Sequence, residues 1–279
     1  MSDILLQTLY PIVAALLYAA LAYHFWNTRW RETDKPLISL PMQPWERGAI
    51  GLALLVHGSG LYLDLFGGDG MRFSFSLALS LMLWLAVLIH LLESFHARMD
   101  GLQPMVMPLA SVCAFLPLAF PEAREVSYAQ SFGFRLHFMA AMLAYSLFTL
   151  SALHGLFIGF AERKLHQRAM TRGLSSLPPI LTMEAILFHM IGIGFLLLSF
   201  ALGSGVFFSE EIFGVPFSVD HKTVFGFAAW AIFATLLVGR HFFGWRGRLT
   251  LRWTMVGFAM LLLTYIGSRF VADVLLGRA

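Results

Sequence analysis

Imidazole and charged side chains occur together where two long apolar stretches begin. His221 stands between Asp220 and Lys222, directly before a long apolar run. His137 follows Arg135 by two residues and also opens an apolar stretch. A haem iron takes two imidazoles as axial ligands, one from each face of the macrocycle. The pattern therefore predicts a haem b site in which His137 and His221 are the iron ligands.

The charged residues beside these histidines suit such a site. Haem propionates need cationic partners, and Arg135, Lys222 and Arg269 supply three guanidinium or ammonium groups. Asp220 can orient a ligand imidazole through its second ring nitrogen, as carboxylates do around metal ligands. Asp220 is equally a good N-cap, and these polar residues would then lie in the lipid headgroup region. Residue spacing leaves both interpretations open.

Two more histidines, His57 and His189, fall near the middle of their apolar stretches. Polar residues at membrane depth are costly and usually face the protein interior. His57 and His189 are therefore a possible second ligand pair. Hydrogen bonding between helices is the interpretation that we prefer for them.

The composition requires a lipid environment around these residues. The chain of 279 residues is 58% hydrophobic and only 13% charged, a balance typical of a membrane protein. Its single cysteine, Cys113, excludes an internal disulfide. We predict an all-α integral membrane protein with a single transmembrane domain over residues 1–279. Eight apolar stretches are long enough to cross a hydrocarbon layer of about 30 Å: Ile4–Trp26, Ala49–Phe66, Phe73–Leu92, Pro104–Phe120, His137–Phe160, Ile180–Val206, His221–His241 and Trp253–Leu276.

Basic residues are shared unequally between the alternating loops. Thirteen of the 19 Lys and Arg residues fall in one set of loops and six in the other. The positive-inside rule places the richer set in the cytoplasm and both termini on the outer, periplasmic side. We expect a multi-pass protein of the bacterial inner membrane whose partner is the lipid bilayer. Nucleic acid is not an expected partner, because no loop combines a basic stripe with stacking aromatics.

This topology brings eight polar residues to one membrane level at the outer side. They include both predicted haem ligands and their charged neighbours. The set is Asp64, Arg72, Arg135, His137, Asp220, His221, Lys222 and Arg269.

Three segments resemble the cytochrome c assembly membrane proteins of the CcsA and CcmC type. "DHKTVFGFAAWAIFATLLVGRHFFGWRGR", from Asp220, resembles their "D-P-K-E-T-W…W…R…G-W-R-G" stretch. "LRWTMVGFAMLLLTYIGSRF" resembles their last span, and "RLHFMAAMLAYSLFTLSALHGLFIGFAERKL" resembles their span with a haem-ligating His. The similarity covers roughly residues 130–276, and the eight-span layout is similar to the HemX/YpjD-like branch.

The resemblance implies a role in haem handling for cytochrome c assembly. It aligns His137 with an outer-face haem ligand and Asp220 with the Asp of a tryptophan-rich haem-presenting segment. His221 stands where the family has Pro, so its ligand role comes from the residue pattern. The chain departs from the family in three places: "GVPFSVD" replaces the tryptophan-rich segment, Val238 replaces a His, and no His follows the last span.

These departures favour haem binding or delivery over enzymatic attachment of haem, so we do not expect an enzyme. Expected partners are haem and proteins of cytochrome c assembly or haem biosynthesis. The alternative is a regulatory or scaffold protein without haem, acting through a partner at cytoplasmic loops such as Arg163–Arg172. A permease is a third possibility, and the few charges inside the spans argue against it.

Overall fold

The computed structural model describes residues 2–31, 42–68, 70–96, 101–121, 123–126, 129, 131–166, 180–210 and 220–264. These residues form long helices and one short pair of strands. The helices are α1 (Ser2–Phe25), which continues as the π-helical turn η1 (Trp26–Trp30), α2 (Pro44–Phe66), α3 (Phe75–Glu93), α4 (Gln103–Ala119), α5 (Phe132–His166), α7 (Ile180–Phe207), α9 (His221–Phe243) and α10 (Arg248–Leu262). The predicted all-α membrane fold is confirmed.

Six of these helices are long and apolar enough to cross a membrane: α1 with η1, α2, α3, α5, α7 and α9. α4 is a shorter apolar helix of 17 residues, and it contains Pro108 and Pro117. α10 is described over 15 residues and ends at Leu262, so the rest of the predicted eighth span lies outside the described residues. The exact count of eight spans therefore stays a prediction.

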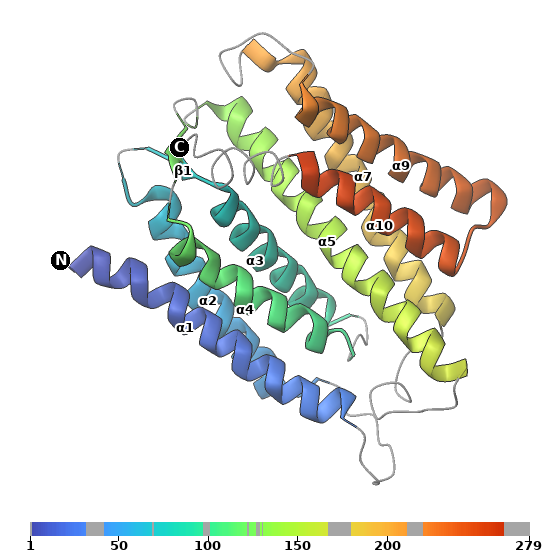
Figure 1. The fold of residues 1–279 in the computed structure, drawn as a ribbon, viewed down its shortest axis with the longest axis horizontal. Helices are drawn as coiled ribbons and strands as arrows, with labels where there is room; N and C mark the ends of the chain where they lie inside the picture. Colours follow the sequence, from blue (N-terminus) through green and yellow to red (C-terminus); the bar gives the residue numbers. More distant parts are fainter. Residues whose placement is uncertain are drawn as a thin grey trace.

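The described helices pack as two groups (Figure 1). In the first group, α1 packs on α2 and α4, and α3 packs on the same two helices. In the second group, α7 and α10 each pack against both α5 and α9. The groups meet through α5, which packs against α3 and, less extensively, against α4. Contacts between α3 and α5 therefore hold the two halves of the bundle together.

Local signals fix where several helices begin and end. Ser74 caps α3 by accepting a hydrogen bond from the Leu77 N–H at 3.2 Å, and Pro44 opens α2 at a position where its missing N–H costs nothing. Gly244 ends α9 in the left-handed conformation at φ 64°, which only glycine adopts readily. The interior is close-packed, as the stacked rings of Phe148 and Phe233 show, with centroids 3.9 Å apart.

The helices alternate in direction, so each end of the bundle has its own set of residues. α1, α3, α5 and α9 begin at the end that we call the His137 end. α2, α4, α7 and α10 begin at the opposite, Glu46 end. Arg29, Arg47, Arg163, Arg240 and Arg248 belong to the Glu46 end, which is the predicted cytoplasmic side.

At the His137 end, two short strands pair across the loops. β1 (Arg72–Phe73) and β2 (Arg124–Glu125) are antiparallel, with Arg72 opposite Glu125. The pair closes over a small apolar cluster that includes Leu61, Leu65, Met71 and Phe134. The strands therefore connect the loop after α2 to the segment before α5.

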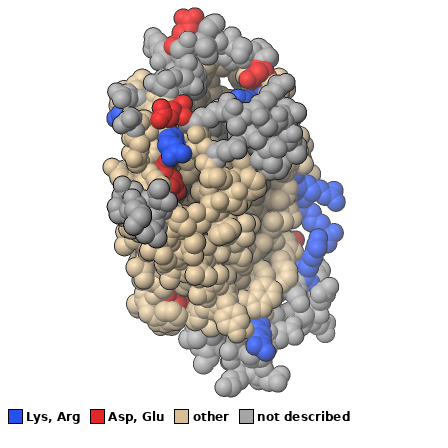
Figure 2. All heavy atoms as spheres, turned by 60° about the vertical axis from the view of Figure 1, so that its left-hand side comes forward, with Lys and Arg blue, Asp and Glu red and all other residues tan. Residues whose placement is uncertain are grey.

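The outer surface of the bundle is apolar between its ends. Leu16, Leu55, Leu196 and Val256 are exposed on α1, α2, α7 and α10. Figure 2 shows a broad face of uncharged residues, with charged side chains grouped near its ends and one edge. An exposed apolar band of this kind suits contact with lipid chains.

Candidate functional site

His137 lies near the start of α5, with its ring against α7. Its Nδ1 is 2.9 Å from the Ser204 hydroxyl oxygen, and the imidazole is partly buried. A Cβ on Gly205 would lie 3.5 Å from the His137 Cε1, an ordinary van der Waals distance, so Gly205 lies directly beside the ring. A hydrogen bond to one ring nitrogen is how proteins orient imidazole ligands. The hydrogen bond to Ser204 therefore fixes the orientation of the His137 ring.

The Asp220–Lys222 segment is the beginning of α9. The Asp220 carboxylate accepts hydrogen bonds from the Thr223 N–H at 2.9 Å and the Thr223 hydroxyl at 3.0 Å, which is an N-cap. Partial burial raises the pKa of the Asp220 carboxyl. The two bonds from Thr223 and the charges of Lys222 and His221 outweigh burial, so its pKa is lowered overall. The structure thus gives Asp220 the capping role that the sequence left open.

His221 and Arg135 are exposed at the His137 end, and Lys222 is partly buried there. Arg135 Nε donates to the Ala129 carbonyl oxygen at 3.1 Å. Arg269 lies outside the described residues, as does the segment 211–219 before Asp220. His137 and His221 thus share one end of the bundle, on two helices that both pack against α7.

The second predicted pair is not brought together. His57 is buried in the first helix group, where its Nε2 lies 2.8 Å from the Ser80 hydroxyl oxygen and its ring meets Tyr18 edge-on. His189 is exposed on α7, in the second group (Figure 1). His57 therefore has the interhelical hydrogen bond that we preferred, whereas His189 is exposed in the other helix group.

A different histidine pair lies where the two groups meet, and the sequence did not identify it. His90 on α3 and His154 on α5 are fully buried, and α3 packs against α5. His154 Nε2 donates to the Met183 carbonyl oxygen at 2.9 Å. Within the described ranges, His154 Nδ1 and both His90 nitrogens have no hydrogen-bond partner. Helix rotation decides such burial, and one sequence alone does not show it.

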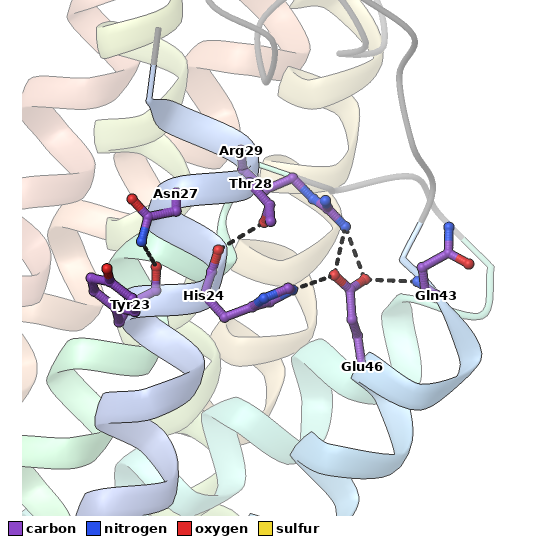
Figure 3. Close-up of polar contacts among 7 residues, drawn as sticks. All are labelled: Tyr23, His24, Asn27, Thr28, Arg29, Gln43 and Glu46. Carbon is purple, nitrogen blue, oxygen red and sulfur yellow. Dashed lines mark hydrogen bonds and ion pairs between the residues drawn. The ribbon is translucent and has the colours of Figure 1, made fainter. Parts of the chain in front are cut away.

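A buried ionic cluster joins α1 to α2 at the Glu46 end (Figure 3). Arg29 Nη2 donates to both Glu46 oxygens, at 3.2 and 2.9 Å. His24 Nε2 lies 2.8 Å from Glu46 Oε1, and the Gln43 N–H donates to Glu46 Oε2 at 2.7 Å. The carboxylate is fully used by the chain itself, so the cluster fixes the α1–α2 connection and leaves little capacity for a ligand.

The Gly-Trp-Arg-Gly turn between α9 and α10 is held in a similar way. Glu184 on α7 accepts a hydrogen bond from the Gly247 N–H at 2.8 Å and lies 3.5 Å from Arg240 Nη1. Arg240 also donates to the Trp245 carbonyl oxygen at 3.1 Å. The Gly-Trp-Arg-Gly stretch, which resembles the assembly proteins, is therefore a turn that the buried Glu184 carboxylate holds in place.

Haem is the cofactor that the residue pattern suggests, so its fit to these groups matters. His137 offers an oriented imidazole, and exposed His221 with its neighbours Arg135 and Lys222 offers a second imidazole and two cations at the same end. These donors are of the type that haem iron and propionates take. Over the ranges that the structure describes, no group of three or more His, Cys, Asp or Glu side chains is arranged to hold a metal ion. His137, His221, Arg135 and Lys222 are therefore the described residues that could hold haem.

Comparison with known proteins identifies the family. A family model described as cytochrome C assembly protein matches residues 50–276. The inner membrane protein YpjD of Escherichia coli K12 is 26% identical over 236 residues, covering 83% of this chain and 89% of YpjD. The cytochrome c biogenesis protein CcsA of Gloeobacter violaceus is 33% identical over 92 residues, covering 33% of this chain and 27% of CcsA. No solved structure matches. Because the family model spans most of the chain, this protein belongs to the cytochrome c assembly protein family.

Proposed function

We propose that this chain binds and handles haem b for cytochrome c assembly in a bacterial inner membrane. His137 and His221 would ligate the iron, and Arg135, Lys222 and Arg269 would hold the propionates. Family membership supports the role in assembly, and the relative named as an inner membrane protein supports the location. The observation that carries the site is the His137 imidazole, oriented by Ser204 at the predicted outer end.

Each residue of the proposed haem site would have its own role. Ser204 keeps the His137 ring in one orientation, so less rotamer freedom is lost when a ligand binds. Asp220 fixes the start of α9 and thereby positions His221. Haem held by His137 and His221 would supply one-electron redox chemistry without activating oxygen. The chain would therefore hold haem in an unreactive form, which suits storage or delivery.

The test is the absorption spectrum of the protein purified in mild detergent from haem-replete cells. The wild-type protein should show sharp alpha and beta bands of low-spin b haem in the reduced-minus-oxidised spectrum. His137→Ala and His221→Ala should each remove the low-spin bands. His241→Ala is the matched control, because His241 is exposed near the opposite end of α9, and it should keep the wild-type spectrum.

The alternative is a regulatory or scaffold protein without haem. The N-cap made by Asp220 favours it, since the cap explains one polar residue of the segment without any cofactor. A colourless protein that stays colourless after haem titration would reject the haem site and support this alternative. Substitution of Arg163 and neighbouring basic residues, followed by co-purification of membrane partners, would then be the informative experiment.

A further inference from the structure

A polar cavity lies inside the first helix group at the His137 end. It has a volume of about 200 Å³, and residues of all four helices α1–α4 and of β1 line it. Its polar lining residues are Gln7, Thr8, Asp64, Arg72, Ser74 and Ser76. We call this cavity the vestibule. It is separate from the proposed haem site, which uses α5, α7 and α9.

Two opposite charges line the vestibule without pairing. Asp64 is in the last turn of α2, Arg72 is in β1, and both are partly buried. The Arg72 charge acts on Asp64, yet no ion pair or hydrogen bond found in the described ranges joins their side chains to each other or to another residue. Charges partly removed from water are costly unless they are paired or hydrogen-bonded. The arrangement therefore has capacity for a charged ligand.

The hydroxyl groups of the vestibule are already engaged. Ser74 Oγ accepts from the Leu77 N–H and lies 2.9 Å from Ser76 Oγ. Ser76 in turn donates to the Phe120 carbonyl oxygen at 2.9 Å. These bonds fix one wall of the vestibule, so recognition falls to the Asp64 and Arg72 charges and to the Gln7 amide.

Size and charge define the ligand. A cavity of about 200 Å³ is below the range of roughly 300–1,000 Å³ that holds drug-sized ligands, so it suits a small polar group and excludes a porphyrin. A purely anionic group would be repelled by Asp64, and a purely cationic group by Arg72. We propose that the vestibule binds a small zwitterionic group, with its anion on Arg72 and its ammonium on Asp64.

Two kinds of molecule could supply the zwitterionic group at this position. The vestibule lies where α2 and α4 end and α3 begins, which is the depth of lipid headgroups, so the phosphoethanolamine headgroup of a phospholipid is one source. A free zwitterion of the same size is the other. Both require the same two charges, and the experiment separates them.

The experiment is native mass spectrometry of the full chain in detergent, with phosphatidylethanolamine and phosphatidylglycerol added at equal concentrations. We expect the wild-type protein to retain phosphatidylethanolamine at least tenfold more strongly, because phosphatidylglycerol has no ammonium. Asp64→Asn and Arg72→Gln should each weaken phosphatidylethanolamine binding by about tenfold, the equivalent of about 1.4 kcal/mol. Asp64→Asn should also narrow the preference between the two lipids, since the carboxylate no longer repels an anionic headgroup.

Controls separate charge recognition from damage to the fold. Arg72→Lys keeps the cation and should retain binding. Glu210→Gln removes an exposed carboxylate at the same end, just beyond the end of α7 at Phe207, and should bind like the wild type. His137→Ala should retain lipid binding as well, so loss of haem and loss of the zwitterion are distinguishable.

Free O-phosphoethanolamine identifies the source. If O-phosphoethanolamine displaces the lipid, and if this displacement requires Asp64 and Arg72, the zwitterionic headgroup alone is the ligand. A soluble zwitterion would then be enough for binding. Binding of the lipid without competition supports a phospholipid that also needs its acyl chains. Equal retention of both lipids by the wild type, or wild-type binding by both single variants, would overturn the proposal.

Discussion

Glu46 Oε2 lies 2.9 Å from Arg29 Nη2, and the two side chains are only 2% and 6% exposed. Such a pair gains stability only when every charged oxygen has a partner, and here His24 and Gln43 complete the set. The pair ties the end of η1 to the first turn of α2. It therefore fixes how the first two helices meet at the predicted cytoplasmic end.

Replacement of Glu46 by Ala should destabilise the protein by about 3–5 kcal/mol, because it leaves the Arg29 guanidinium buried without its counter-ion. Denaturant unfolding of the purified protein in detergent measures this change. Glu125→Ala removes an exposed carboxylate in β2 and should stay within about 0.5 kcal/mol of the wild type. A similar small effect at Glu46 would show that the cluster contributes nothing to stability.

His90→Leu should leave stability unchanged or raise it. Neither His90 nitrogen has a hydrogen-bond partner within the described ranges, and each unsatisfied buried polar group costs about 1–3 kcal/mol. His57→Leu is the comparison, because it removes the 2.8 Å bond to Ser80 and should destabilise by about 1 kcal/mol. Both variants can be measured by unfolding in the same detergent. A loss of stability in His90→Leu would instead indicate that the His90–His154 pair binds a group that stabilises the fold.

Asp220→Ala should cost about 0.5–2 kcal/mol by removing the N-cap of α9, whereas Asp220→Asn should keep most of it. The cap also makes stability depend on pH. The pKa of Asp220 is lowered in the folded protein, so its contribution is complete above the unfolded value near 3.9 and is lost as pH falls through the folded pKa. The free energies of unfolding of the wild type and Asp220→Ala, measured from pH 7 to pH 3, should therefore become more similar at the acid end. A constant gap would contradict the ionised cap.

Gly247→Ala should destabilise the turn between α9 and α10 by about 1–3 kcal/mol. Gly247 has φ 61° and ψ −133°, a combination that is almost restricted to glycine. Gly48→Ala is the control, since a Cβ at this helical position meets nothing within 4 Å, and it should be neutral or stabilise by up to about 1 kcal/mol. Thermal unfolding of both variants tests the turn, and equal melting temperatures would contradict the conformational argument.

Membrane embedding, the helical class and the family were readable from the sequence alone. Hydropathy sums over a window of residues and does not depend on how a helix is rotated, so the runs that became α2, α3, α7 and α9 were found within a few residues of their ends. The cap at Asp220 was one of two interpretations that the sequence left open, and it could be proposed because it depends on residues that are close together in the chain. The family signal comes from local strings of the same kind.

Only the tertiary structure decided which polar residues meet. Apolar residues lie on every side of these helices, so the sequence does not show which face of α3 meets α5. For the same reason it does not show that His90 and His154 are buried. Asp64 and Arg72 lie in different elements, and their shared vestibule depends on how the four helices α1–α4 close around it. His57 and His189 seemed equivalent by depth, yet packing buried one and exposed the other. Depth follows from counting residues along one helix, whereas a contact between helices depends on the rotation and packing of both.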